Sequence, residues 1–121
     1  MDYRNKNIGN FGEEKACEYL LQQSFEILHR NYRVGHLEVD IIAKNTTTNI
    51  LHFIEVKTRS SLAFGLPEES ISAKKMNNLK RAAQHFLENN PKYQQIQFDV
   101  FAITMHKSEV KEIFVIEDVF F

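Results

Sequence analysis

Apolar and polar residues alternate most regularly in the middle of the chain. Two short runs rich in Ile and Val, residues 37–43 and 50–58, are typical of buried strands, and the polar segment 44–49 between them is typical of a turn. Because the runs are adjacent and joined by a short turn, they predict an antiparallel hairpin.

The remaining apolar patterns predict two helices and three more strands. Apolar residues three and four positions apart predict helices over about residues 10–23 and 72–88. Strands are expected at residues 24–33, 96–105 and 110–117. The order αβββαββ predicts an α/β fold, a three-layer sandwich around a mixed central sheet, with residues 1–121 as one domain.

Four ionisable side chains interrupt the apolar hairpin. A hairpin centred on residues 47–48 makes the numbers of facing residues sum to about 95, which places Asp40 opposite Glu55 and Glu38 opposite Lys57. Side chains alternate between the two faces of a strand, so all four are expected on one face. Facing Cβ atoms lie ~4.5–5.5 Å apart, and two carboxylates at that distance either share a proton or hold a cation.

Two interpretations of these charges remain open. In the first, Glu38 and Lys57 form a cross-strand ion pair while Asp40 and Glu55 line a hydrated face; this leaves the opposed carboxylates unexplained. In the second, the carboxylates form a seat for Mg²⁺ or Mn²⁺, which both prefer oxygen ligands.

The first predicted helix carries a third candidate carboxylate. Asn10 and Glu13 have the spacing of a capping box, which would account for Glu13 locally. Glu13 also shares the apolar stripe of Ala16, Cys17, Leu20 and Leu21, so the alternative is that it points toward the acidic face of the hairpin.

Other polar residues have simpler interpretations. His52 is expected to be a satisfied or exposed histidine. Asp99 is expected to be a polar residue of an edge strand rather than a functional carboxylate. Residues 59–67 have the composition of a loop, and Pro67 with Glu68 and Glu69 would suit a helix start. The apolar tail 119–121 either packs back on the protein or forms a dimer contact.

Composition excludes several classes of protein. The start of the chain has no apolar signal core and no run is long enough to span a membrane, so a cytoplasmic protein is expected. Cys17 is the single cysteine, which excludes an internal disulfide and a cysteine-based zinc site. The net charge of −1 argues against binding nucleic acid by bulk electrostatics, although basic residues gather mid-chain and allow a local basic face.

The spacing of Asp40 and Glu55-Val56-Lys57 resembles the core motif of restriction-endonuclease-like nucleases, the PD-(D/E)xK superfamily. With Glu13 on a preceding helix the chain is also similar to archaeal Holliday junction resolvases. It most closely resembles the small bacterial YraN family, an uncharacterised family of that superfamily. The resemblance rests on five segments: residues 9–16, 28–33, 37–43, 53–59 and 98–100. Two departures are Leu37, where the family usually has Gly, and Val39, where the classical motif has Pro.

This resemblance implies a restriction-endonuclease-like fold and a nuclease site. Asp40, Glu55 and Glu13 would bind Mg²⁺ or Mn²⁺, and Lys57 would assist the attacking water. Glu38 would either support the metal ligands or orient Lys57. The DNA backbone would be positioned by five basic residues: Arg30, Arg33, Arg59, Lys74 and Lys75. A junction or branched DNA substrate would favour a homodimer, because two symmetric cuts need two sites.

Two other functions remain open. In the first, the same fold serves as a non-catalytic module that binds nucleic acid or a DNA-repair protein. In the second, it is a structural interaction domain in which the charges form ion pairs and the apolar tail drives assembly.

Overall fold

The structure is a computed structural model that describes residues 3–60, 72–107 and 109–119. Within these residues the order is α1 (Tyr3–Gln22), β1 (Phe25–Val34), β2 (Leu37–Asn45), β3 (Leu51–Ser60), α2 (Ala73–Asn89), β4 (Ile96–His106) and β5 (Glu109–Ile116). The predicted order αβββαββ is confirmed.

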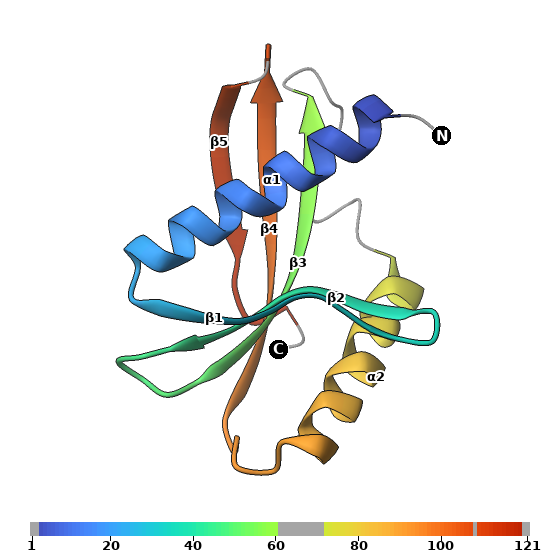
Figure 1. Ribbon diagram of the computed structural model, residues 1–121, viewed down its shortest axis with the longest axis vertical. Coiled ribbons are helices and arrows are strands. Elements are labelled where there is room, and N and C mark those ends of the chain that lie inside the picture. Colours follow the sequence, from blue (N-terminus) through green and yellow to red (C-terminus); the bar gives the residue numbers. More distant parts are fainter. Residues whose placement is uncertain (1–2, 61–71, 108, 120–121) are drawn as a thin grey trace.

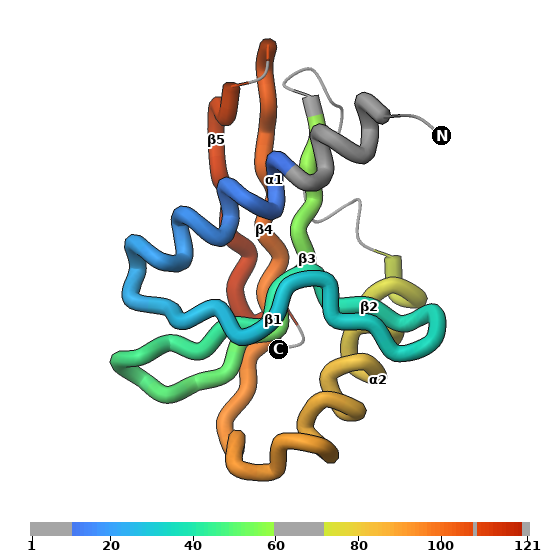
Figure 2. Tube along the Cα trace, viewed as in Figure 1, coloured from blue at the N-terminus to red at the C-terminus, as the bar shows by residue number. Residues whose placement is uncertain are grey.

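The strands form one mixed sheet in the order β1-β2-β3-β4-β5. Only the β3–β4 pair is parallel among these neighbours, and α2 lies in the crossover between those two strands. β1 and β2 cross β3, β4 and β5 at a steep angle (Figure 1). The trace in Figure 2 shows β2 and β3 running together from their shared turn and then separating.

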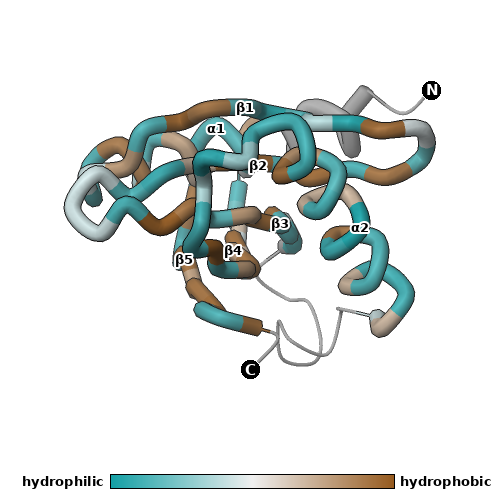
Figure 3. Tube along the Cα trace, turned by 90° about the horizontal axis from the view of Figure 1, so that it is seen from below, coloured by the Kyte–Doolittle hydropathy of each residue, from teal (hydrophilic) through white to brown (hydrophobic). Residues whose placement is uncertain are grey.

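Two hydrophobic clusters cover the two faces of this sheet. Leu79 and Phe86 of α2 pack with Phe53 of β3, whereas Leu20 of α1 packs with the next residue of β3, Ile54. Successive residues of a strand point to opposite faces, so α1 and α2 lie on opposite sides of the sheet and complete three layers. Hydrophobic positions run along the strands between the helices, while α2 displays mostly hydrophilic positions (Figure 3).

The second helix agrees closely with the sequence pattern. α2 follows the N-cap residue Ser72, whose Oγ accepts a hydrogen bond of 3.0 Å from the N–H of Lys75. The predicted apolar residues Leu79, Ala83 and Phe86 are buried. The alternative start at residues 67–69 lies outside the described residues.

The predicted start of the first helix is wrong. α1 begins at Tyr3, so Asn10 lies inside the helix and cannot be its N-cap. Asn and Gly each lower helix stability by only about 1 kcal/mol or less relative to Ala, which is not enough to end a helix. Of the predicted apolar stripe, Leu20 is buried, but Leu21 is 60% exposed.

Two smaller expectations concern the end of β3 and the residues that follow β5. β3 pairs with β4 as far as Ser60, so Arg59 lies in a strand and the predicted loop start is wrong. Val119 packs back on the α2 side of the core and donates its N–H to the carbonyl of Phe98 at 2.9 Å; residues 120–121 lie outside the described part. No helix among the described residues is both long and apolar enough to cross a membrane.

Candidate functional site

Asp40 lies where β2 and β3 separate. The ladder pairs Lys44 with Leu51 and ends at Ile41 and Ile54, which is the predicted register. One residue further, Asp40 Oδ2 accepts a hydrogen bond of 2.8 Å from the N–H of Val56. In a continuing ladder a β2 carbonyl would accept that bond. The carboxylate therefore takes the place of a backbone acceptor and sits in the opening between the strands.

Glu55 lies on the α2 side of β3, immediately before the amide that holds Asp40. Its side chain is 10% exposed, and Oε1 lies 3.0 Å from Nζ of Lys75 in the first turn of α2. Because Ser72 caps this turn, the helix start fixes the backbone from which Lys75 reaches the carboxylate.

Glu13 approaches the same region from α1. Its side chain is 14% exposed, and its Oε1 is buried without a hydrogen-bond partner in the described part of the chain. The nearest cation is Arg30 of β1, with Nη2 3.9 Å from that oxygen. Burial raises the pKa of Glu13, and Arg30 opposes the rise. The expectation that Glu13 points toward the acidic hairpin is supported by its repulsion from Glu38 and Glu55.

The electrostatics of Asp40 show how closely these groups interact. Burial, and then the charge of Glu55, raise the pKa of Asp40 from 3.8 to about 7, while the N–H of Val56 opposes the rise. Glu13 and Glu38 raise it further. The structure therefore brings Asp40, Glu55 and Glu13 into one electrostatic cluster.

Lys57 belongs to this cluster as well. Burial lowers its pKa, and contact with Lys75 lowers it further, while Glu55 and Asp40 act in the opposite direction. Two lysines, one from β3 and one from α2, thus lie beside the carboxylates. Lys57 therefore lies within electrostatic range of Glu55 and Asp40.

The predicted pairing of Glu38 with Lys57 is wrong. β2 has left β3 at this point, and Glu38 lies opposite Arg33 of β1, with Oε2 3.1 Å from Nη2 of the arginine. The Glu38 side chain is 41% exposed. The hairpin register could not reveal this, because it describes the strands only as far as they stay paired.

The five predicted DNA-contacting residues divide into two groups. Arg30, Arg33 and Lys75 form ion pairs with Glu13, Glu38 and Glu55, respectively. Lys74 is exposed, and Arg59 lies in β3 half-buried. The sequence missed that Lys75 contacts Glu55, since the fold of α2 onto β3 decides which of two adjacent lysines points inward.

The sequence also misjudged Asp99. β4 lies between β3 and β5, so Asp99 is not on an edge strand; it is buried and bonded to His52, with Oδ2 2.6 Å from Nδ1. His52 is therefore a satisfied histidine, as expected. The strand order, which no local pattern reveals, was the missing information.

The donor set of the cluster suits a hard divalent cation. Asp40, Glu55 and Glu13 interact electrostatically, one oxygen of Glu13 is buried without a hydrogen bond, and burial disfavours the charged form of Asp40. As the side chains stand, no three His, Cys, Asp or Glu residues among those described are close enough to hold an ion. One Glu55 oxygen, Oε1, is paired with Lys75.

These features define an α/β protein with an acidic cluster built where two antiparallel strands of a mixed sheet diverge. The chain belongs to the Uncharacterised protein family UPF0102, whose model matches residues 12–103. That segment includes Glu13, Asp40, Glu55, Lys57 and Lys75. The family membership expected from the sequence is confirmed.

Individual relatives match over nearly their whole length. A UPF0102 protein of Caldicellulosiruptor saccharolyticus is 46% identical over 117 residues, covering 95% of this chain and 98% of the relative. A UPF0102 protein of Dictyoglomus turgidum is 43% identical over 108 residues, covering 88% and 90%. One from Desulforamulus reducens is 41% identical over 116 residues, covering 93% and 94%.

Proposed function

We propose that this protein is a metal-dependent nuclease that hydrolyses phosphodiester bonds of DNA, with branched DNA as its preferred substrate. The observation that carries the proposal is the buried Asp40 carboxylate, whose pKa is raised to about 7 beside Glu55 and Lys57. A structural ion-pair network does not explain why a carboxylate is buried where its charged form is disfavoured, whereas a cation-binding site does.

Each residue of the cluster has a definite role in this proposal. Asp40, Glu55 and Glu13 hold the ion, and the Val56 N–H keeps Asp40 at the opening between the strands. When bound, Mg²⁺ or Mn²⁺ polarises the phosphate and lowers the pKa of bound water. Lys57, with its lowered pKa, orients the attacking water and stabilises charge on the phosphate.

Basic residues around the cluster would hold the DNA backbone. Lys74, which is exposed, contacts phosphates directly, and Arg30 and Lys75 do so once the metal neutralises their partners Glu13 and Glu55. Arg33 and Arg59 lie beside them and contribute to the same basic surface. Such contacts position the strand and carry no sequence information. This fits a substrate recognised by its structure, for which a homodimer would supply two sites.

The proposal is tested by incubating the protein with linear duplex, single-stranded, flap and four-way DNA in Mn²⁺, in Mg²⁺ and in EDTA. We expect cutting of branched DNA that requires the metal. Asp40→Asn and Lys57→Ala should each lower the rate at least about 100-fold, the scale of losing one charged group at a reacting phosphate. Asp118→Asn, the same change at an exposed position, should cut at the wild-type rate.

Two outcomes contradict nuclease activity and identify an alternative. If DNA is bound through Arg59 and Lys74 but never cut, the protein is a non-catalytic nucleic-acid-binding module. If no DNA is bound at ~100 mM salt, the charged cluster has a structural role.

A further inference from the structure

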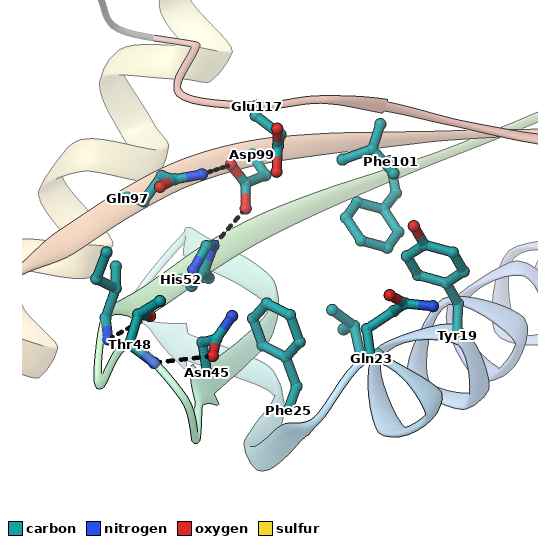
Figure 4. A pocket seen from close by; sticks show the side chains of 13 residues that line it. Tyr19, Gln23, Phe25, Asn45, Thr48, His52, Gln97, Asp99, Phe101 and Glu117 are labelled. Carbon is teal, nitrogen blue, oxygen red and sulfur yellow. Dashed lines mark hydrogen bonds and ion pairs between the residues drawn. The ribbon is translucent and has the colours of Figure 1, made fainter.

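A pocket of about 480 Å³ opens on the α1 side of the sheet. It is lined by the end of α1, the start of β1, the β2–β3 turn and strands β3, β4 and β5 (Figure 4). His52 of β3 contributes to this pocket, whereas Glu55, an odd number of residues away, faces the opposite side of the sheet. The pocket is thus separate from the acidic cluster, and its volume is in the range of small-molecule sites.

The polar wall of the pocket is fixed by a buried pair. Asp99 Oδ2 lies 2.6 Å from Nδ1 of His52, and the two side chains are 5% and 7% exposed. The other Asp99 oxygen accepts hydrogen bonds from Gln97 Nε2 at 2.9 Å and from the N–H of Asp118 at 3.1 Å. In neutral His52 the carboxylate holds the proton on Nδ1, which makes Nε2 a hydrogen-bond acceptor.

Asn45 supplies a donor near this acceptor. Its Oδ1 already accepts the N–H groups of Thr47 and Thr48, at 2.9 and 3.1 Å. The side chain therefore offers its Nδ2 amide group, which lies in the space between His52 and Phe25 in Figure 4. A donor and an acceptor on the same side of a pocket are complementary to the edge of a ring that carries its own acceptor and donor.

The other walls are aromatic and carry no positive charge. Phe25 meets the His52 ring edge-on, with centroids 4.8 Å apart, and Tyr19 packs against Phe101 at 5.7 Å. The described lining residues include the acids Asp99 and Glu117 but no Lys or Arg, which disfavours phosphate or any other anion. A flat, neutral, nitrogen-containing ring fits both the aromatic walls and the hydrogen-bonding groups.

We propose that this pocket binds a nucleobase, supplied either by a free nucleoside or by an unpaired base of a nucleic-acid strand. The ring stacks against Phe25, its donor faces Nε2 of His52 and its acceptor faces Nδ2 of Asn45. The proposal does not require the acidic cluster to bind metal or to cut DNA.

The test is a titration of ¹⁵N-labelled protein by NMR in EDTA, so that metal-dependent chemistry cannot contribute. The probes are the common nucleosides, a single-stranded tetranucleotide, ribose 5-phosphate as a base-free control and N-acetyl-tyrosinamide as a peptide aromatic. We expect nucleosides at millimolar concentration to shift amide signals of residues 25, 48 and 52. The tetranucleotide shifts the same signals if the pocket accepts a base within a strand, and not if it accepts only the free nucleoside.

Two variants and a matched control locate the site. Phe25→Leu should weaken binding about 5- to 150-fold, the range for losing one base–aromatic stack. His52→Asn keeps an N–H for Asp99 but removes Nε2, so binding should fall while the protein stays folded. Phe114→Leu, the same change at a residue 45% exposed on β5 and outside the pocket, should bind as wild type.

Three results would overturn the proposal. They are an absence of shifts at the pocket with every nucleoside and the tetranucleotide, equal affinity in Phe25→Leu and Phe114→Leu, and tighter binding of N-acetyl-tyrosinamide than of any nucleoside. The last would identify the pocket as a site for a peptide aromatic side chain. None of these results bears on metal-dependent cutting by the acidic cluster.

Discussion

Asp40 uses its two carboxylate oxygens differently. Oδ2 closes the end of the β2–β3 ladder through the N–H of Val56, while the charge of the carboxylate interacts with Glu55. A carboxylate bound to a backbone amide would ordinarily have a lowered pKa, but here burial and Glu55 outweigh that bond. The position therefore combines a structural hydrogen bond with a charge that the folded protein disfavours.

This conflict predicts a pH-dependent stability. Since the pKa of Asp40 is raised from 3.8 to about 7 by folding, the folded state binds its proton more tightly than the unfolded chain. The contribution of this group is most favourable below about pH 4 and is lost as pH rises through about 7. In EDTA at pH 8, Asp40→Asn should raise the free energy of unfolding by about 1–3 kcal/mol, because the amide oxygen still accepts from Val56 and the charge is gone.

Urea unfolding of both proteins across this pH range measures the difference. The gain in Asp40→Asn should shrink as the pH falls, and Mn²⁺ should stabilise the wild type more than the variant. A variant that is less stable than wild type at pH 8 without metal would show that Asp40 is not repelled by Glu55.

At the scale of elements, the approach of α1 to β3 decides where Glu13 lies. Gly12 faces Thr58, and a Cβ on Gly12 would overlap Thr58 Oγ1 and lie 3.2 Å from Thr58 Cβ. The absence of a side chain thus allows the helix to lie against the strand, and the next residue, Glu13, reaches the cluster.

We therefore expect Gly12→Ala to lower the free energy of unfolding by about 1–3 kcal/mol through overpacking, despite the better helix propensity of Ala. Thr58→Ala should restore most of the loss when combined with it, which a double-mutant cycle by urea unfolding would measure. A Gly12→Ala protein as stable as wild type would mean that α1 and β3 can separate freely.

The elements also show what the sequence could and could not predict. The turn around residues 47–48 specified the β2–β3 register, because the position and length of the turn fix the pairing of a hairpin. It did not predict that the strands separate before Glu38 reaches Lys57, because that depends on the twist of β1 and β2 away from the rest of the sheet. Asp99 was misjudged for a similar reason, since strand order is set by long-range packing.

For the whole molecule, the net charge is −1, and several of its acidic and basic residues are paired with one another. Arg30, Arg33 and Lys75 are engaged with Glu13, Glu38 and Glu55. Phosphates of DNA would have to compete with these carboxylates for the same cations. A divalent ion held by Glu13 and Glu55 would release Arg30 and Lys75 toward DNA, so metal binding and DNA binding should be positively coupled.

We accordingly expect Mg²⁺ at constant ionic strength to raise the affinity for a fluorescently labelled four-way DNA about 10-fold, measured by polarisation before cutting proceeds. Asp40→Asn combined with Glu55→Gln should bind the DNA more tightly than wild type in EDTA and should gain little from Mg²⁺, because two competing charges are already removed. Glu109→Gln combined with Glu112→Gln changes the net charge equally at exposed positions on β5 and should keep the full Mg²⁺ response. If both double variants behave alike, DNA affinity depends on overall charge and the acidic cluster has no special part in it.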